Sequence, residues 1–117
     1  MKISDSEMQI MDIIWSAEGE LCCADIMERM HTSRKQTTIQ TFLKRLCDKG
    51  ALKVRKEGKT NYFTANITEE EYKKELTEEF LNETHNGSLK SLFAALAGSK
   101  QPDKAEIEEI KKWFEQI

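Results

Sequence analysis

The sequence predicts a mainly α-helical protein with one small β-hairpin, and three observations lead to this fold class. Apolar residues recur with helical spacing over most of the chain. One central stretch instead alternates between apolar and charged residues on both sides of a glycine, which is typical of a hairpin. The 117 residues contain no run of about 18 apolar residues, so no membrane-spanning helix and no direct membrane binding are expected.

Two helices are predicted before the clearest one. The first covers Asp5 to Ser16, with Asp5 or Ser6 as the expected cap, and it ends before Gly19. A single bridging residue, Leu21, is expected next. The second helix is short and amphipathic, and a turn at residues 31–35 follows it. Its apolar stripe consists of Cys23, Ile26, Met27 and Met30.

The third helix has the clearest pattern, and Gly50 is expected to form its left-handed C-terminal cap. Its apolar stripe consists of Ile39, Phe42, Leu43, Leu46 and Cys47. The opposite face carries Thr37, Gln40, Thr41 and Lys44. Short donors and acceptors of this kind suit base edges and phosphates better than they suit an ordinary solvated helix surface.

A basic hairpin is predicted after this helix. Strands are expected at residues 52–56 and 61–65, with a tight turn at 57–59. The order of three helices and a hairpin, within about 65 residues, is that of a winged helix-turn-helix whose third helix is the recognition element. A winged helix that binds only other proteins remains the alternative.

The net charge of −3 conceals an uneven distribution of charge. Residues 34–59 contain nine basic and two acidic side chains, which gives +7, whereas the segments before and after each carry −5. A polyanion is therefore expected to bind the central window and to be repelled elsewhere.

The character of the chain changes at residue 67, so a winged-helix domain is predicted at 1–66 and a helical domain at 67–117. Thr68 and Glu71 form a capping-box motif, and residues 86–88 interrupt the helix that it opens. A loop is expected at residues 98–102. Asp103 then provides the cap of a last helix.

The apolar stripes of these three helices are too narrow to form an independent core. Exposed stripes of this kind suggest that a second copy of the chain covers them, which makes the segment a dimerisation domain. Folding of the helices back onto the first domain is the alternative. The expected dimer interface consists of Tyr72, Leu76, Phe80, Leu89, Leu92, Phe93, Leu96, Ile107, Ile110, Trp113 and Phe114.

Nothing in the sequence indicates an enzyme or a cofactor. His31 and His85 belong to different domains and have no nucleophile nearby in the sequence. Cys22, Cys23 and Cys47 form no CxxC pair, so we expect reduced, core-packed thiols in a cytoplasmic protein, and no metal. A metal site formed by Cys22, Cys23 and His31 is the weaker alternative.

Several stretches carry a resemblance to a known family. They are residues 4–7 with Met11 and Trp15, residues 86–92, residues 106–110, and above all residues 38–52, which follow the pattern T-[VI]-x-T-[LF]-[LI]-x-R-L-x-x-K-G-x-[LI]. The chain resembles the BlaI/MecI-type penicillinase repressors, with the CopY copper-responsive repressors as relatives. The C-terminal half contains no cysteine, so the copper-binding mode of those relatives is not expected.

The resemblance implies a dimeric repressor whose winged helices bind the two halves of an inverted repeat in double-stranded operator DNA. Gln40 is the expected base reader. Pairing of Arg45 with Asp48 or another nearby acid, rather than with DNA, is the alternative for that residue. The other residues that the match assigns to DNA are Thr37, Thr38, Thr41, Lys44 and Arg45 on the helix and Arg55, Lys56, Lys59 and Tyr62 on the wing.

The resemblance also implies how the repressor is inactivated. A membrane-bound sensor metallopeptidase triggers cutting in the dimerisation domain, and the aligned bond is Ala95–Leu96, where family members have Asn-Phe. The expected target is an operon of the β-lactamase or antibiotic-resistance type. A winged-helix regulator that responds directly to a small molecule or a metal is the alternative.

Overall fold

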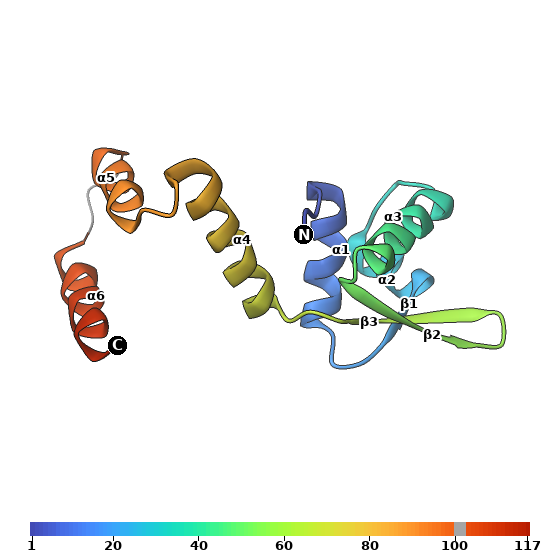
Figure 1. Ribbon diagram of the computed structural model, residues 1–117. Helices are drawn as coiled ribbons and strands as arrows, with labels where there is room; N and C mark the ends of the chain where they lie inside the picture. The colour runs from blue at the N-terminus through green and yellow to red at the C-terminus, as the bar shows by residue number, and fades with distance from the viewer. Residues whose placement is uncertain (100–102) are drawn as a thin grey trace. The chain divides into compact units, whose positions relative to one another are not determined.

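The computed structural model describes residues 1–99 and 103–117, and it divides into two compact units, Met1–Leu76 and Thr77–Ile117. The fold class predicted from the sequence, mainly helical with a small sheet, is confirmed. In chain order the elements are α1 (Asp5–Ser16), β1 (Leu21–Cys22), α2 (Cys23–Met30), α3 (Gln36–Asp48), β2 (Leu52–Glu57), β3 (Thr60–Ala65), α4 (Glu69–His85), α5 (Leu89–Ser99) and α6 (Lys104–Gln116) (Figure 1).

The first unit contains an antiparallel sheet in the order β1-β3-β2. β2 and β3 form the predicted hairpin, which extends beyond the helices as a wing (Figure 1). The turn is shorter than expected, because Glu57 stays in β2 and pairs with Thr60. The loop is thus only Gly58 and Lys59, and the φ of +60° at Gly58 is a conformation that glycine adopts without strain.

The start of α1 differs from the prediction, because its cap is Ser4 and not Asp5 or Ser6. Ser4 has an extended backbone, and its hydroxyl accepts a hydrogen bond from the Glu7 amide at 3.2 Å. The Glu7 carboxylate accepts the Ser4 amide at 2.9 Å, which completes a capping box. Asp5 and Ser6 already lie in the first turn of the helix, where a side chain cannot fill this role.

The end of α3 confirms the predicted left-handed cap. Gly50 has a φ of +84° and donates its amide to the Cys47 carbonyl at 3.0 Å. The Ala51 amide donates to the Leu46 carbonyl at 2.9 Å. These two bonds form a Schellman motif, which ends the helix and directs the chain into β2.

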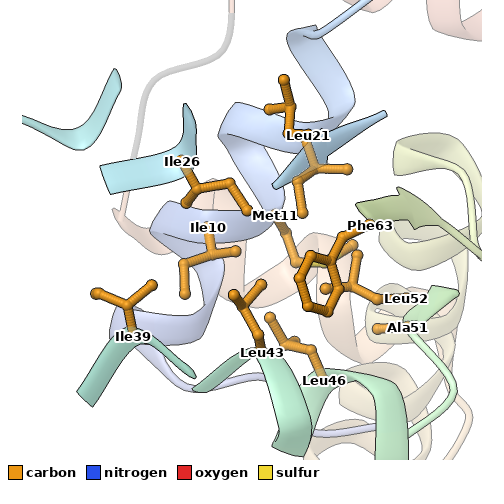
Figure 2. Close-up of a cluster of buried hydrophobic side chains, with 11 residues drawn as sticks. Ile10, Met11, Leu21, Ile26, Ile39, Leu43, Leu46, Ala51, Leu52 and Phe63 are labelled. Carbon is orange, nitrogen blue, oxygen red and sulfur yellow. The ribbon is translucent and has the colours of Figure 1, made fainter. Parts of the chain in front are cut away.

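The core of the first unit lies between the three helices and the sheet (Figure 2). The helices contribute Ile10, Met11, Ile14, Ile26, Ile39, Leu43 and Leu46. The three strands contribute Leu21, Leu52 and Phe63, and Ala51 lies directly before β2. All of these side chains are at most 7% exposed. This packing fixes which face of α3 is turned outward.

The first two turns of α4 belong to the first unit. Trp15 donates its indole N–H to the Ile67 carbonyl at 2.9 Å, and its ring lies 5.9 Å from that of Tyr72. The amino group of Met1 forms an ion pair with Glu75 at 2.8 Å. The first compact unit therefore continues to Leu76, past the expected boundary at residue 66.

The helices of the second unit largely follow the prediction. Asn86 and Gly87 have positive φ angles and separate α4 from α5. α5 continues through Gly98 and Ser99, where a loop was expected, so that prediction was wrong for these two residues. The rest of the expected loop lies outside the described residues. Asp103 caps α6 as predicted, since its carboxylate accepts the Ala105 amide at 3.0 Å.

Candidate nucleic-acid interface

The polar face of α3 points away from the core. Because Ile39, Leu43 and Leu46 are buried, the helical period turns the opposite side chains to solvent. Thr38 is half-buried at the edge of this face. The exposed members of the predicted set on this helix are Thr37, Gln40, Thr41, Lys44 and Arg45.

Two of these side chains differ in what they can offer to a ligand. The Thr41 hydroxyl donates to the Thr37 carbonyl at 3.0 Å within the helix, so it must rotate before it can donate to a phosphate. Gln40 makes no hydrogen bond to any described side chain or carbonyl, and it keeps both its amide donors and its acceptor.

Arg45 forms no ion pair with Asp48 or with any other described acid.

A groove of about 680 Å³ lies between α3 and the hairpin. From α3 it is lined by Gln36, Gln40 and Lys44, and from the hairpin by Lys59 and Asn61, among others. The structure thus brings the predicted recognition face and part of the predicted wing onto one concave surface.

All three cysteines line this groove and are half-buried. Burial raises the pKa of the Cys23 and Cys47 thiols, which therefore stay protonated at neutral pH. The Cys22 Sγ donates to the Asp25 carboxylate at 3.2 Å. His31 does not line the groove, and the described residues contain no group of three potential ligands, so the alternative metal site is not supported.

Only two of the nine cations in the basic window, residues 34–59, are engaged in ion pairs among the residues that the structure describes. Lys49 binds Glu7, and Arg55 binds Glu20 and Glu57. The seven others lie on the surface of α3, the turn before it and the hairpin, and they are Arg34, Lys35, Lys44, Arg45, Lys53, Lys56 and Lys59. The excess positive charge of the sequence is therefore displayed on α3, the turn before it and the hairpin, and two of these cations, Lys44 and Lys59, line the groove.

Sequence reasoning missed the pair between Lys49 and Glu7. The Lys49 Nζ donates to the two Glu7 oxygens at 2.6 and 3.0 Å, and the Glu7 side chain is 3% exposed. Burial by itself raises the pKa of Glu7, but the hydrogen bonds from Lys49 and Ser4 outweigh it and lower that pKa. This pair joins the start of α1 to the end of α3.

Arg55 was also expected to be a free wing cation, and the structure shows it paired. Its guanidinium donates to Glu20 and Glu57 and lies over the Tyr62 ring, 4.9 Å from the ring centre. The hydrogen bonds to Glu20 and Glu57 raise the pKa of Arg55 still further. Hydrogen bonding to Arg55 likewise lowers the pKa of Glu20.

The second unit exposes many apolar side chains. A groove of about 400 Å³ runs between α5 and α6, lined mainly by Phe93, Leu96, Ile107 and Ile110. Tyr72 differs from the other predicted interface residues, since it is 6% exposed and packed within the first unit. The exposed large apolar residues of this predicted set are Leu76, Phe80, Leu89, Phe93, Leu96, Ile110, Trp113 and Phe114, while Leu92 and Ile107 are half-buried.

The predicted cleavage bond, Ala95–Leu96, lies within α5, and both residues are exposed. Within the described ranges, no helix is long and apolar enough to cross a membrane.

Comparison with known proteins confirms the resemblance found in the sequence. The sequence model of the penicillinase repressor family matches residues 3–116. The chain is 36% identical over 116 residues to the penicillinase repressor of Bacillus licheniformis, covering 98% of this chain and 91% of that protein. It is 31% identical over 114 residues to the penicillinase repressor of Staphylococcus aureus, covering 95% and 89%.

A solved structure resembles the first unit. The solution structure of the DNA-binding domain of the repressor BlaI has 36% sequence identity and a TM-score of 0.55, and the match covers 61% of this chain and 88% of that one. The winged-helix arrangement and a family match over nearly the whole length together show that the chain belongs to the penicillinase repressor family.

Proposed function

We propose that this protein is a homodimeric transcriptional repressor of the cytoplasm that binds an inverted-repeat operator. The observation that carries the proposal is the polar outward side of α3 beside the groove, together with seven cations on α3, the turn before it and the hairpin that form no ion pair among the described residues. A phosphate backbone is attracted to such a surface and repelled by the acidic remainder of the chain.

Each side chain of this face has a role that follows from its chemistry. Gln40 projects into the major groove and pairs with a base edge, for which a free amide is suited. Thr38, Arg45 and Lys44 bind phosphates and fix the position of α3 on the duplex, as do Thr37 and Thr41 after rotation of the Thr41 hydroxyl. Lys56, Lys59 and Tyr62 place the wing against the adjoining backbone or minor groove.

The second unit supplies the contact between two copies. Exposed apolar side chains on α4, α5 and α6, together with the groove lined by Phe93 and Ile110, favour burial against another chain. Tyr72 is left out of this interface because the first unit already buries it. A dimer joins two weak half-site interactions, so occupancy of the operator rises through effective concentration.

Loss of the dimer is then the route to induction. We propose that a membrane-bound sensor metallopeptidase triggers cutting of Ala95–Leu96, and that the repressor controls an operon of the β-lactamase or antibiotic-resistance type. The bond lies in a helix, which must unwind locally to enter a peptidase site. α5 buries none of its described side chains completely, so this unwinding costs little packing.

Selection of bound sequences from random duplex DNA tests the proposed function. The expected product is an inverted repeat whose half-sites are separated by about 34 Å or a multiple of it. Enrichment of a single, non-palindromic site would contradict the dimeric mode. Absence of any salt-dependent binding to duplex DNA would contradict DNA recognition altogether and favour a protein-binding winged helix.

A truncated chain, tested on the selected operator, examines the inactivation step. A chain ending at Ala95 is expected to be monomeric in sedimentation and to lose operator binding, because its half-site affinity is no longer multiplied. Undiminished binding by this truncated chain would contradict induction through the loss of the dimer.

A further inference from the structure

Arg55 directs nearly all of its hydrogen-bond donors at carboxylates of its own chain. Its Nε donates to the two Glu20 oxygens at 3.1 and 3.0 Å. Both terminal nitrogens donate to the Glu57 Oε2 at 3.2 Å, and one of them also donates to Glu20. The guanidinium has five N–H groups, so little remains to receive a phosphate.

The sheet explains how two residues 35 positions apart in the sequence meet. In the order β1-β3-β2, Tyr62 of β3 is paired on one side with Arg55 and on the other with Cys22. The Arg55 side chain crosses the Tyr62 ring and reaches Glu20, which directly precedes β1. The arginine is thereby held along the sheet.

This arrangement changes the charge of the wing. One guanidinium with two carboxylates gives a local charge of −1, where the sequence alone suggested a free cation. The pair is also partly solvated, since the Arg55 side chain is 51% exposed and that of Glu20 is 35% exposed. An ion pair in such a setting is weak enough for a phosphate, which has similar acceptor geometry, to replace the carboxylate.

We propose that Glu20, assisted by Glu57, is an intramolecular competitor of DNA for Arg55. The proposal rests on the proposed function, namely that the hairpin meets a nucleic-acid backbone. Glu20 occupies the arginine in the free protein and still competes for it when a duplex is bound, so the wild type forms this phosphate contact only in part. Glu20 therefore lowers the affinity for DNA of any sequence, and its removal releases one more phosphate-binding cation.

Glu20→Gln in the full chain tests the competition, because glutamine keeps the size of the side chain and removes its charge. The probe is a random-sequence duplex of about 20 base pairs, titrated at several salt concentrations. At about 0.1 M salt we expect binding to be roughly two- to fivefold tighter than in the wild type. The slope of log affinity against log salt is expected to become steeper by up to about 0.9, the value for one complete further phosphate contact.

Glu18→Gln is the matched control. Glu18 lies in the same loop and carries the same charge, but it forms no bond to Arg55 or to any other described residue. Its removal should leave the salt slope unchanged. In an Arg55→Ala background, Glu20→Gln should no longer change the slope, because no cation is left to release.

Unchanged or weaker binding by Glu20→Gln, with the thermal midpoint of unfolding preserved, would overturn the competition. If the midpoint falls, Glu57→Gln provides the same test at the other carboxylate. Affinity and salt slope equal to those of the wild type in Glu57→Gln would then overturn the proposal as well. When the wild type binds duplex DNA and these variants do not differ from it, only this inference fails. A wild type that binds no duplex contradicts both this inference and the proposed function.

Discussion

Among single residues, Gln40 and Thr41 illustrate how a side chain's own contacts decide what it can recognise. Both are exposed neighbours on α3, but the Thr41 hydroxyl is already engaged by the Thr37 carbonyl at 3.0 Å. Gln40 remains able to donate and accept at once, which is what the edge of an adenine requires. We therefore assign base reading to Gln40 and phosphate contact to its neighbours.

Gln40→Ala is expected to reduce discrimination at one base pair of the operator by about 1–3 kcal/mol, because the paired hydrogen bonds to that base are lost. Competition between the selected operator and its single-base variants measures this. Gln9→Ala, which removes the same group from an exposed position of α1 outside the groove, should keep the discrimination. Equal weakening toward matched and mismatched sites in Gln40→Ala would show that Gln40 does not read a base.

Lys56→Ala is expected to weaken binding to every duplex alike. One phosphate contact is lost, so the magnitude of the salt slope should fall by about 0.9. The control is Lys74→Ala, which removes an exposed lysine of α4 outside the basic window. A salt slope for Lys56→Ala equal to that of the wild type would rule out contact between this lysine and a phosphate.

Among the elements, α1 and α3 are joined at their ends by an ion pair. Glu7 completes the capping box of α1 and at the same time accepts a hydrogen bond from the ammonium of Lys49, the residue that caps the end of α3. The Lys49 side chain is 33% exposed, so this pair is less costly to desolvate than a fully buried one. The contact fixes the end of the recognition helix next to the start of the first helix.

Glu7→Gln is expected to lower the free energy of unfolding by about 1–3 kcal/mol at neutral pH, because Lys49 and the Ser4 amide lose a charged acceptor. Urea denaturation measures the loss. Glu28→Gln, an exposed position on α2, is the control and should change stability little.

The same pair predicts a dependence on pH. The pKa of Glu7 is lower in the folded chain than its ordinary value of 4.5, so the unfolded chain binds the proton more readily. The stabilisation is therefore complete above pH 4.5 and disappears as the pH falls through the lowered pKa. The difference in stability between the wild type and Glu7→Gln should shrink on acidification, and a constant difference would exclude this titration.

Taken together, the two units carry two different kinds of surface, one cationic and one apolar and acidic. Cations without an ion-pair partner among the described residues gather on α3, the turn before it and the hairpin of the first unit, whereas the second unit is acidic and rich in exposed apolar side chains. A surface that is both apolar and acidic favours contact with another protein over contact with DNA. This separation is the physical basis for assigning DNA binding and association to different units.

Trp113→Glu is expected to raise the dimer dissociation constant at least about tenfold, because large aromatic residues dominate the energy of interfaces. Trp113 is 58% exposed, so the substitution should leave the unit folded. Sedimentation velocity measures the dissociation, and Gln116→Glu on the same helix adds the same charge without loss of apolar area. A dimer that persists in Trp113→Glu would place the interface elsewhere.

The helices, the hairpin and their order could be predicted from the sequence, since helical periodicity, strand alternation and the cap at Gly50 are local properties. It also determined the outward face of α3, because a helix with one apolar stripe has a single way to face a core. The family follows from sequence as well, through the pattern at residues 38–52.

Which cations pair with an acid within the described residues became clear only from the packed structure. Lys49 meets Glu7 across 42 positions, and Arg55 meets Glu20 across 35, so counting charges could not distinguish these two cations from the other seven. The packed structure likewise decided that Tyr72 packs on Trp15. The physical reason is that an ion pair or a ring contact forms only within a few ångströms, and distances of that kind between remote residues are set by packing of the whole unit.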